Sequence, residues 1–274
     1  MAQQIEIICI GNELLIGKVV NTNAQWLAKS ITTFGLSVNR VTVIGDSVEE
    51  ISAAIREAVQ RKPQFIITTG GLGPTFDDMT LEGVAKALSR SLEVNPQALK
   101  MVEEKYRRYV EEGRIEKIEL TPPRVKMAKL PTESNPLPNP IGTAPGVITK
   151  YNGVTIIALP GVPSEMEAIF DESVAPLIKR AAGNVTFYET SIDIDGIMES
   201  DMAPLIDRVM HDNPYVYVKS HPSRTGEGKP HLELHLSTTA ENSTTAKNRV
   251  IKALVQITEL AQMKGGKTKL SKTK

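Results

Sequence analysis

A strand-like run that ends in a glycine-rich turn limits most strongly what this chain can fold into. Phe65–Thr69 is a short β-forming run, and Gly70-Gly71-Leu72-Gly73 follows it directly. Open α/β sheets bind ligands at the carboxyl ends of their parallel strands, and glycines let backbone N–H groups approach an anion closely. The pattern predicts a strand-to-turn-to-helix unit with either a phosphate cradle or a tight turn without ligand.

Alternating strand and helix patterns precede this turn. Strands are predicted over Ile5–Ile10 and Val38–Ile44, and an amphipathic helix over Asn23–Phe34 ends at Gly35. Ser47 is expected to cap the next helix while Glu50 reaches back to it. After the turn, Thr80 is expected to cap a helix to about Leu88, and Asn95-Pro96 to open one to about Tyr109. The order predicts βαβ units and a mainly parallel sheet.

The second half of the chain divides further. Prolines cluster between Pro122 and Pro145, which indicates a turn-rich segment, and Asn152-Gly153 predicts a hairpin of Gly146–Lys150 with Val154–Leu159. From about Gly183 the pattern becomes β-α-β-β-α, enough for a small α+β domain. We therefore expect a first domain over 1–182, a second over 183–262, and a disordered basic tail over 263–274.

Composition excludes several classes of protein. Formal charge balances at +0, so no overall basic field favours nucleic acid. There is neither a basic leader nor an apolar stretch of about 18 residues, so we expect a cytoplasmic protein without a membrane role. Cys9 lies in an apolar strand pattern, where it is interpreted as a buried hydrophobe. His231 and His235 are too far apart on a strand to share a metal ion, and Met198, Met202 and Met210 are interpreted as packing residues.

Asp77 and Asp78 follow the glycine turn and favour the ligand-binding interpretation. Two carboxylates beside a phosphate repel it unless a cation compensates, and Mg²⁺ bridges carboxylates to phosphates. Helix N-terminal charge is the structural alternative. A Walker A loop would need Gly-Lys before Ser or Thr, and a dinucleotide fingerprint would need glycine where Phe76 stands, so neither motif is present.

Together these and other segments resemble the N-terminal region of the CinA family, in order and spacing, over about residues 5–170. The segments are Gly11-Asn12-Glu13-Leu14-Leu15, Gly17, Asn21-Thr22-Asn23-Ala24, Val43-Ile44-Gly45-Asp46, Thr69–Thr75 with Asp77-Asp78 and Thr80, Asn139–Gly146, and Leu159–Met166. The resemblance implies an α/β fold with a mainly parallel three-layer sheet of the molybdopterin-binding (MoaB/MogA-like) type, followed by a small α+β domain of KH type. The chain ends after that domain, so the amidase activity of longer CinA proteins is not expected.

The resemblance also implies a function. It is metal-dependent hydrolysis of a nucleotide pyrophosphate, most simply ADP-ribose to AMP and ribose 5-phosphate. The expected cofactor is a divalent ion (Mg²⁺, Mn²⁺ or Co²⁺), with a monovalent cation as a further candidate. Two alternatives remain. One is a molybdopterin adenylyltransferase, the only case in which molybdopterin is expected as a ligand of the enzyme. The other is a non-catalytic nucleotide- or pterin-binding module.

Candidate site residues follow position by position. Asp78, Asp77 and Glu13 are the catalytic candidates, and Asp78 and Asp77 the metal ligands. The substrate-binding candidates are Asn12, Asn21, Asn23, Asp46, Thr69, Gly70, Gly71, Gly73, Thr75, Gly142, Thr143, Ala144, Pro160, Gly161 and Glu165. Helix capping by Asn23 and a left-handed turn at Asn21 are the structural alternatives. The second domain lacks a Gly-x-x-Gly loop, so RNA is not expected as a partner, whereas a nucleotide substrate and a homodimer are.

Overall fold

The computed structural model describes residues 4–224 and 230–271, which form two compact units. Unit 1 comprises residues 1–32 and 36–181, and unit 2 comprises 33–35 and 182–274. The division at Ala181 and Ala182 lies beside the position expected from the sequence. In the described part of the chain no helix combines the length and apolarity needed to cross a membrane.

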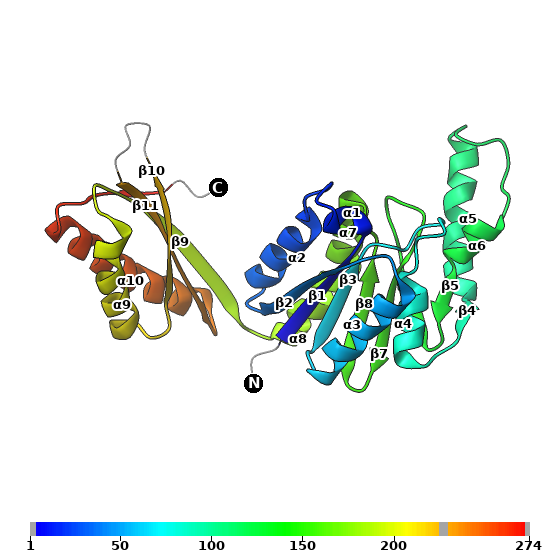
Figure 1. Ribbon diagram of the computed structural model, residues 1–274, viewed down its shortest axis with the longest axis horizontal. Helices are drawn as coiled ribbons and strands as arrows, with labels where there is room; N and C mark the ends of the chain where they lie inside the picture. Colours follow the sequence, from blue (N-terminus) through cyan, green and yellow to red (C-terminus); the bar gives the residue numbers. More distant parts are fainter. Residues whose placement is uncertain (1–3, 225–229, 272–274) are drawn as a thin grey trace. The chain divides into compact units, whose positions relative to one another are not determined.

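Unit 1 is built on a six-stranded sheet with the order β2-β1-β3-β8-β7-β6 (Figure 1). Strands β1 (Gln4–Ile10), β2 (Ser37–Ile44), β3 (Phe65–Thr69) and β8 (Val154–Leu159) are parallel neighbours. Strands β7 (Gly146–Tyr151) and β6 (Ser134–Leu137) complete the sheet in antiparallel pairing. The sheet is therefore mainly parallel, as the alternating pattern predicted.

Helices cover both faces of this sheet (Figure 1). Ile8 and Ile10 of β1 pack with α3 (Val48–Gln60) and α4 (Thr80–Leu88) in one apolar core. Because side chains alternate along a strand, Ile7 and Cys9 face the opposite layer, which contains α2 (Thr22–Thr33) and the helical run α7 (Pro163–Ile169), η1 (Phe170–Val174) and α8 (Ala175–Ala182). Trp26 of α2 meets Phe170 edge-on at 5.2 Å between ring centres. The result is three layers.

Cys9 is fully buried, and burial raises the pKa of its thiol, with a hydrogen bond to the Asn21 side chain opposing the rise. The packing interpretation of this residue therefore fits its surroundings.

Several helix starts follow the predicted chemistry, and two differ. Ser47 caps α3 by accepting the Glu50 N–H. The Glu50 side chain does not accept the Ser47 N–H, because that N–H donates to the Gly45 carbonyl. The Glu50 carboxylate accepts the Gly45 N–H instead, at 3.2 Å. Asn95 caps α5 (Pro96–Glu111) as predicted. Thr80 is the first residue of α4 rather than its cap, and its hydroxyl donates to the Gly70 carbonyl at 2.7 Å.

The proline-rich segment is less irregular than predicted. It contains a short helix, α6 (Pro122–Lys126), and strands β5 (Lys129–Pro131) and β6; β5 pairs with β4 (Leu92–Val94). Prolines are tolerated here because Pro122 and Pro123 occupy the first turn of α6 and Pro136 lies on an edge strand. The hairpin between β7 and β8 is confirmed, with positive φ at both Asn152 (49°) and Gly153 (80°).

Unit 2 is a four-stranded antiparallel sheet, β10-β11-β9-β12, packed on two helices. Its elements are β9 (Thr186–Asp195), α9 (Glu199–Asp212), β10 (Tyr217–Arg224), β11 (Pro230–Ala240), α10 (Ser243–Met263) and β12 (Lys267–Leu270). Met202 and alternate residues of β11, such as Leu234, form the apolar core. His231 lies outside that core, where its Nδ1 is 2.7 Å from Asp195 Oδ1.

The expectation of a disordered tail from residue 263 is wrong for its first part. Residues 267–270 form β12, which pairs with β9 so that Lys267 lies opposite Asp195 and Lys269 opposite Asp193. Charged side chains, lysine above all, are common on edge strands, so a sequence that looks like a basic tail can form one. Residues 272–274 lie outside the described part.

Candidate functional site

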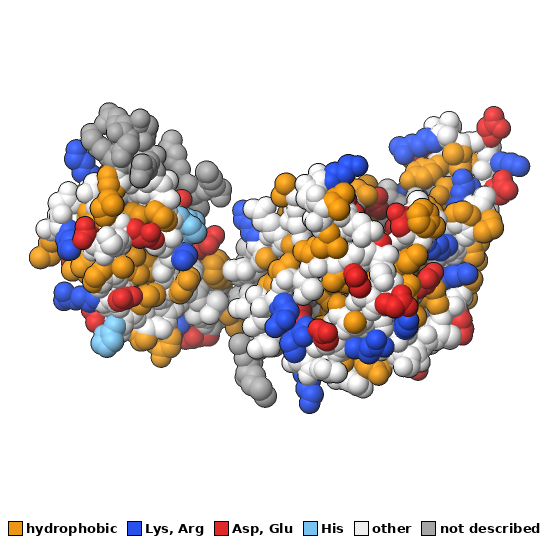
Figure 2. Space-filling view, viewed as in Figure 1, with side chains coloured by type: hydrophobic (Ala, Val, Ile, Leu, Met, Phe, Trp, Pro, Cys, Tyr) orange, Lys and Arg blue, Asp and Glu red, His pale blue; other side chains and the backbone are white. Residues whose placement is uncertain are grey.

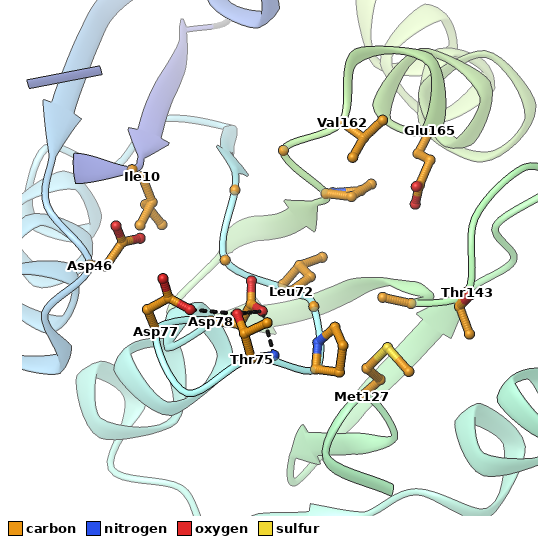
Figure 3. Close-up of a pocket in the computed structure, with 18 of the residues that line it drawn as sticks. Ile10, Asp46, Leu72, Thr75, Asp77, Asp78, Met127, Thr143, Val162 and Glu165 are labelled. Carbon is orange, nitrogen blue, oxygen red and sulfur yellow. Dashed lines mark hydrogen bonds between the residues drawn. The ribbon is translucent and has the colours of Figure 1, made fainter. Parts of the chain in front are cut away.

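A cavity of about 430 Å³ opens where β1, β3 and β8 end in unit 1 (Figure 3). Parallel strands deliver their following loops to one edge of the sheet, so segments distant in sequence meet there. The lining residues are Ile10, Gly11, Glu13, Asp46, Gly70, Gly71, Leu72, Gly73, Pro74, Thr75, Asp77, Asp78, Tyr106, Met127, Thr143, Ala144, Pro160, Gly161, Val162 and Glu165. Most of the candidate residues are thus brought together.

The glycine turn after β3 has a backbone that only glycine allows. Gly70 has φ of 113°, and a Cβ there would lie 2.1 Å from the carbonyl oxygen of Ile10. Gly71 has φ of 64°, and a Cβ there would lie 2.4 Å from Thr80 Oγ1. The hydroxyl of Thr80 holds this turn through its bond to the Gly70 carbonyl. The chain therefore crosses the end of β1 as bare backbone exposed to the cavity.

A compact turn at Thr75–Asp78 forms one wall. Asp78 Oδ2 accepts the Thr75 N–H at 2.8 Å and lies 2.6 Å from Thr75 Oγ1, which also lies 2.5 Å from Asp77 Oδ1. A hydroxyl has one proton, so it can donate to only one of these carboxylates at a time. The Lys126 ammonium donates to the Thr75 carbonyl. The Thr75 hydroxyl bond, and then the backbone N–H of Asp77 and the charge of Lys126, lower the pKa of Asp77.

Asp46 approaches the same wall from the loop after β2. Its Oδ2 accepts the Asn12 N–H at 2.8 Å, and the Asn12 side chain accepts the Asp46 N–H at 3.4 Å. Burial raises the pKa of Asp46, and the negative charges of Glu13, Asp77 and Asp78 raise it further. We name Glu13, Asp46, Asp77 and Asp78 the acidic cluster. Asn12 itself is not among the lining residues and instead joins the two loops.

The acidic cluster is not by itself a finished metal site. Within residues 4–224 and 230–271, no group of three or more His, Cys, Asp and Glu side chains is arranged to hold a metal ion. Within the acidic cluster, the charges of Glu13, Asp77 and Asp78 add to the effect of burial in raising the pKa of Asp46. A cation bound here would need oxygen ligands from a second source, such as phosphate or water.

Asn21, Asn23 and Thr69 line a smaller neighbouring cavity of about 90 Å³. The Asn23 amide donates to Thr69 Oγ1 at 2.9 Å and to the Gly161 carbonyl at 2.8 Å. Thr69 in turn donates to the Pro160 carbonyl at 2.9 Å. Asn21 Oδ1 accepts the Ala24 N–H at 3.1 Å, so Asn21 rather than Asn23 caps α2. These bonds connect α2, β3 and the turn after β8.

Glu165 of α7 enters the main cavity from the side opposite Asp46, Asp77 and Asp78 (Figure 3). Asn139 fixes it by donating to Glu165 Oε2 at 2.7 Å, and also donates to the Ala144 carbonyl at 2.8 Å. A Cβ on Gly142 would lie 1.8 Å from the same carboxylate, so a larger residue there would displace the Glu165 side chain. Gly142 borders a separate cavity of about 180 Å³ rather than the main one. It therefore shapes the site without lining it.

The sequence did not indicate every lining residue. Gly11, Leu72, Pro74 and Val162 lie inside motifs that were recognised, so their positions were available as a signal. Tyr106 and Met127 come from α5 and from the end of α6, outside every motif. Both residues reach the cavity because α5 and α6 lie in the segment that connects the paired strands β4 and β5, and the sequence does not show that arrangement.

Comparison with known proteins agrees with this architecture. A family model described as a probable molybdopterin binding domain matches residues 6–180. A protein of Sulfurisphaera tokodaii is 43% identical over 95% of this chain and 96% of its own length, and one of Pyrobaculum calidifontis is 46% identical over 94% and 95%. The crystal structure of the protein CinA from Thermoplasma acidophilum, described as of unknown function, is 42% identical, with a TM-score of 0.59, over 65% of this chain and 98% of its own.

The family model covers unit 1 almost completely and includes all residues that line the main cavity, and the two relatives match almost the whole chain. The predicted α/β fold, with a mainly parallel sheet of the molybdopterin-binding type and a separate antiparallel sheet, is confirmed. The chain therefore belongs to the family of probable molybdopterin binding domains and is CinA-like.

Proposed function

We propose that this protein hydrolyses a nucleotide pyrophosphate, with ADP-ribose as the substrate and AMP and ribose 5-phosphate as products. The main support is one cavity that joins a bare glycine backbone to the acidic cluster. Backbone N–H groups at such a turn suit phosphate oxygens, whereas carboxylates repel them. A glycine backbone beside the acidic cluster therefore suits a diphosphate that binds together with a cation. The volume of the main cavity is in the range of small-molecule sites.

The donor chemistry of the acidic cluster fits a hard divalent cation. Mg²⁺ prefers oxygen ligands and is usually held by one or two carboxylates together with substrate phosphates and water. Asp78 and Asp77 are our candidates for those carboxylates, because the Thr75 turn fixes both. Such an ion would polarise the phosphoryl group and offset the repulsion among the carboxylates.

The remaining residues have separate tasks in this proposal. The turn from Gly71 to Gly73 holds the diphosphate by its backbone, because the Gly70 N–H already donates to the Leu159 carbonyl. Asn12 keeps Asp46 in place. Glu13 is our candidate to accept the proton of the attacking water, since Asp77 and Asp78 already share the Thr75 hydroxyl. Water adds to one phosphorus, the P–O–P bridge breaks, and the released phosphate keeps the bridging oxygen.

The test is direct. Purified protein is incubated with ADP-ribose and Mg²⁺, Mn²⁺ or Co²⁺, and AMP and ribose 5-phosphate are separated by ion-exchange chromatography. Equal amounts of both products, formed only with a divalent ion and lost in Asp78→Asn, support the proposal. Absence of product with all three ions contradicts it.

Family membership favours a second candidate, adenylyl transfer to molybdopterin. The matching domain is described as a probable molybdopterin binding domain. Incubation with ATP and molybdopterin, followed by detection of the adenylylated pterin, distinguishes this reaction from hydrolysis. If ADP-ribose or molybdopterin binds and is not converted, the result supports the third interpretation, a non-catalytic binding module.

Unit 2 is proposed to be a KH-type domain with a packing role in a homodimer. Its strand and helix order is β9-α9-β10-β11-α10-β12, and the sequence of this unit contains no Gly-x-x-Gly motif. Light scattering coupled to size exclusion measures the molar mass, for which twice the chain mass of 29.9 kDa is expected.

A further inference from the structure

The sheet of unit 2 has two chemically different faces. One face packs on α9 and α10, and on β11 it carries Leu232 and Leu234. Because side chains alternate along a strand, His231, Glu233 and His235 lie on the opposite face. All three side chains are partly exposed to solvent, so small ions can reach them.

The neighbouring strand β10 brings another histidine to this face. His221 lies directly opposite Glu233 in the antiparallel pairing, and His235 lies two residues further along β11. Such diagonal neighbours are within reach of aromatic side chains. The rings of His221 and His235 meet edge-on, with 4.9 Å between their centres. The pairing of β10 with β11 thus gathers two imidazoles and a carboxylate, which the sequence alone does not show.

Glu233 and His235 already have the spacing of two ligands of one metal ion. His235 Nε2 lies 3.3 Å from Glu233 Oε1. Two ligands that each lie about 2.0 Å from a tetrahedral Zn²⁺ are about 3.3 Å apart. In the described residues no three such side chains converge on one point, so a metal ion requires one more ligand to turn toward it. The side chain of His221 is exposed and free to do so.

His231 lies on the same face and has other partners. Its Nδ1 lies 2.7 Å from Asp195 Oδ1, and its Nε2 lies 3.5 Å from Asp193 Oδ1. Both ring nitrogens therefore face carboxylates of β9. His231 is also about 13 Å from His235 along β11, too far to share an ion with it. It is a natural control for a site at His235.

The charges around the three side chains favour a cation. Asp193 of β9 lies opposite Glu233, so a second carboxylate adjoins the first. Lys219 of β10 lies opposite His235, but it is exposed, and a lysine can extend its ammonium group into water. Asp193 and Glu233 are shorter and stay on the sheet surface.

We propose that His221, His235 and Glu233 form a binding site for a transition-metal ion such as Zn²⁺. Imidazole suits Zn²⁺, Ni²⁺ and Cu²⁺, whereas Mg²⁺ prefers oxygen ligands. The site therefore differs in ion preference from the acidic cluster of unit 1. The three side chains fill three positions of a tetrahedral ion, and water fills the fourth. Because the ion links β10 to β11, binding it stabilises unit 2.

The experiment measures Zn²⁺ binding to the full chain, without an affinity tag, by isothermal titration calorimetry. Excess Mg²⁺ is present to occupy sites made of oxygen ligands. Loss of a group that only supports a metal ligand costs about 10–100-fold in affinity, so His221→Ala and His235→Ala should raise the Kd at least about 100-fold. Glu233→Gln should raise it at least about tenfold. His231→Ala and His211→Ala are the matched controls and should bind Zn²⁺ like the wild type.

Nuclear magnetic resonance identifies the ligands independently. The chain has four histidines, so their ring C–H signals can be assigned from the four single His→Ala variants. Zn²⁺ should shift the signals of His221 and His235 and leave that of His211 in place. In each variant, unchanged signals of the remaining histidines show that unit 2 is still folded.

Several results would overturn the site. They are no Zn²⁺ binding by the wild type at micromolar concentration, an unchanged Kd in His221→Ala, His235→Ala or Glu233→Gln, and an equal loss in His231→Ala and His221→Ala. The last result would mean that the ion is held by the acidic face as a whole rather than by the two imidazoles. None of these residues takes part in the proposed hydrolysis, so the two proposals fail or hold separately.

Discussion

At the scale of single residues, Asn23 shows how a polar side chain near a ligand site can serve the fold. Its amide hydrogens are donated to Thr69 Oγ1 and to the Gly161 carbonyl, which join α2 to the ends of β3 and β8. The Gly161 carbonyl can only accept, so the nitrogen of the amide must face it. The sequence left substrate binding and a structural role open for this residue, and these bonds give it a structural one.

Removing that amide should cost stability. Asn23→Ala leaves buried acceptors without a donor, so we expect the free energy of unfolding to fall by about 1–3 kcal/mol. Urea denaturation followed by circular dichroism measures the change. Asn39 lies exposed on β2, so Asn39→Ala should change stability by less than about 0.5 kcal/mol. Equal effects of the two substitutions would contradict the structural role.

The ionisation of Asp46 should make stability depend on pH. Burial and the neighbouring carboxylates raise its pKa, so its charged form is less favourable in the folded chain than in the unfolded one. Its contribution is therefore fully present below the unfolded pKa and is lost as pH rises through the folded pKa. Asp46→Asn should be more stable than the wild type near pH 7, and this gain should vanish at about pH 3.

Urea midpoints across that pH range, without divalent ions, measure the effect. Asp212 is a control of opposite sign, because hydrogen bonds to Gln256 and His211 lower its pKa. Asp212→Asn should therefore lose stability above the unfolded pKa. An Asp46→Asn variant that is less stable than the wild type near pH 7 would contradict a destabilising charge on Asp46 in the folded chain.

At the scale of elements, the turn after β3 determines how closely two strands end together. A Cβ at Gly70 would meet the backbone oxygen of Ile10, which belongs to a buried strand and cannot move aside easily. Gly153 also has positive φ, at 80°, but nothing lies within 4 Å of its Cβ position. Alanine substitutions at Gly153 and Gly70 therefore separate two costs in folding free energy. Gly153 reports the cost of positive φ alone, and Gly70 adds the cost of a steric clash.

Alanine at these positions should therefore have unequal effects. Gly153→Ala should cost about 1–2 kcal/mol, the conformational term alone. Gly70→Ala adds a backbone clash, and we expect a loss above about 4 kcal/mol, together with loss of AMP binding. Thermal and urea unfolding of both variants measure the difference. Similar losses in both would mean that the turn has room that the structure does not show.

How much of unit 1 could be predicted differs from element to element. β3 was predicted with its observed bounds because a continuous β-forming run meets a glycine turn, and the hairpin of β7 and β8 because Asn-Gly suits positive φ. The role of Thr80 was not predictable, because its hydroxyl bonds to a carbonyl that only tertiary folding brings near. Tyr106 was missed for the same reason, since no periodicity within α5 tells which helix face meets the glycine loop.

At the scale of the whole molecule, all residues that line the main cavity belong to unit 1. We therefore expect a chain ending at Ala181 to fold and to bind AMP with a Kd within about twofold of the full chain, since no lining residue is removed. Calorimetry on both chains measures this. A folded short chain that no longer binds AMP would show that residues beyond Ala181 contribute to the site.

Mixed surface charge also belongs to this scale. On the face of unit 1 visible in Figure 2, Lys and Arg side chains are interspersed with Asp and Glu, in line with the formal charge of +0. Selectivity for a phosphate ligand must then come from the cavity rather than from a field of the whole protein.

The most direct test of the central proposal is the release of AMP from ADP-ribose by the wild type and by Asp78→Asn, with Mg²⁺ present and with it chelated. We predict AMP release that requires the ion and falls at least about 100-fold in Asp78→Asn, while AMP binding persists. Release that survives chelation or the substitution would contradict the proposed site, and so would its complete absence from a wild type that binds AMP.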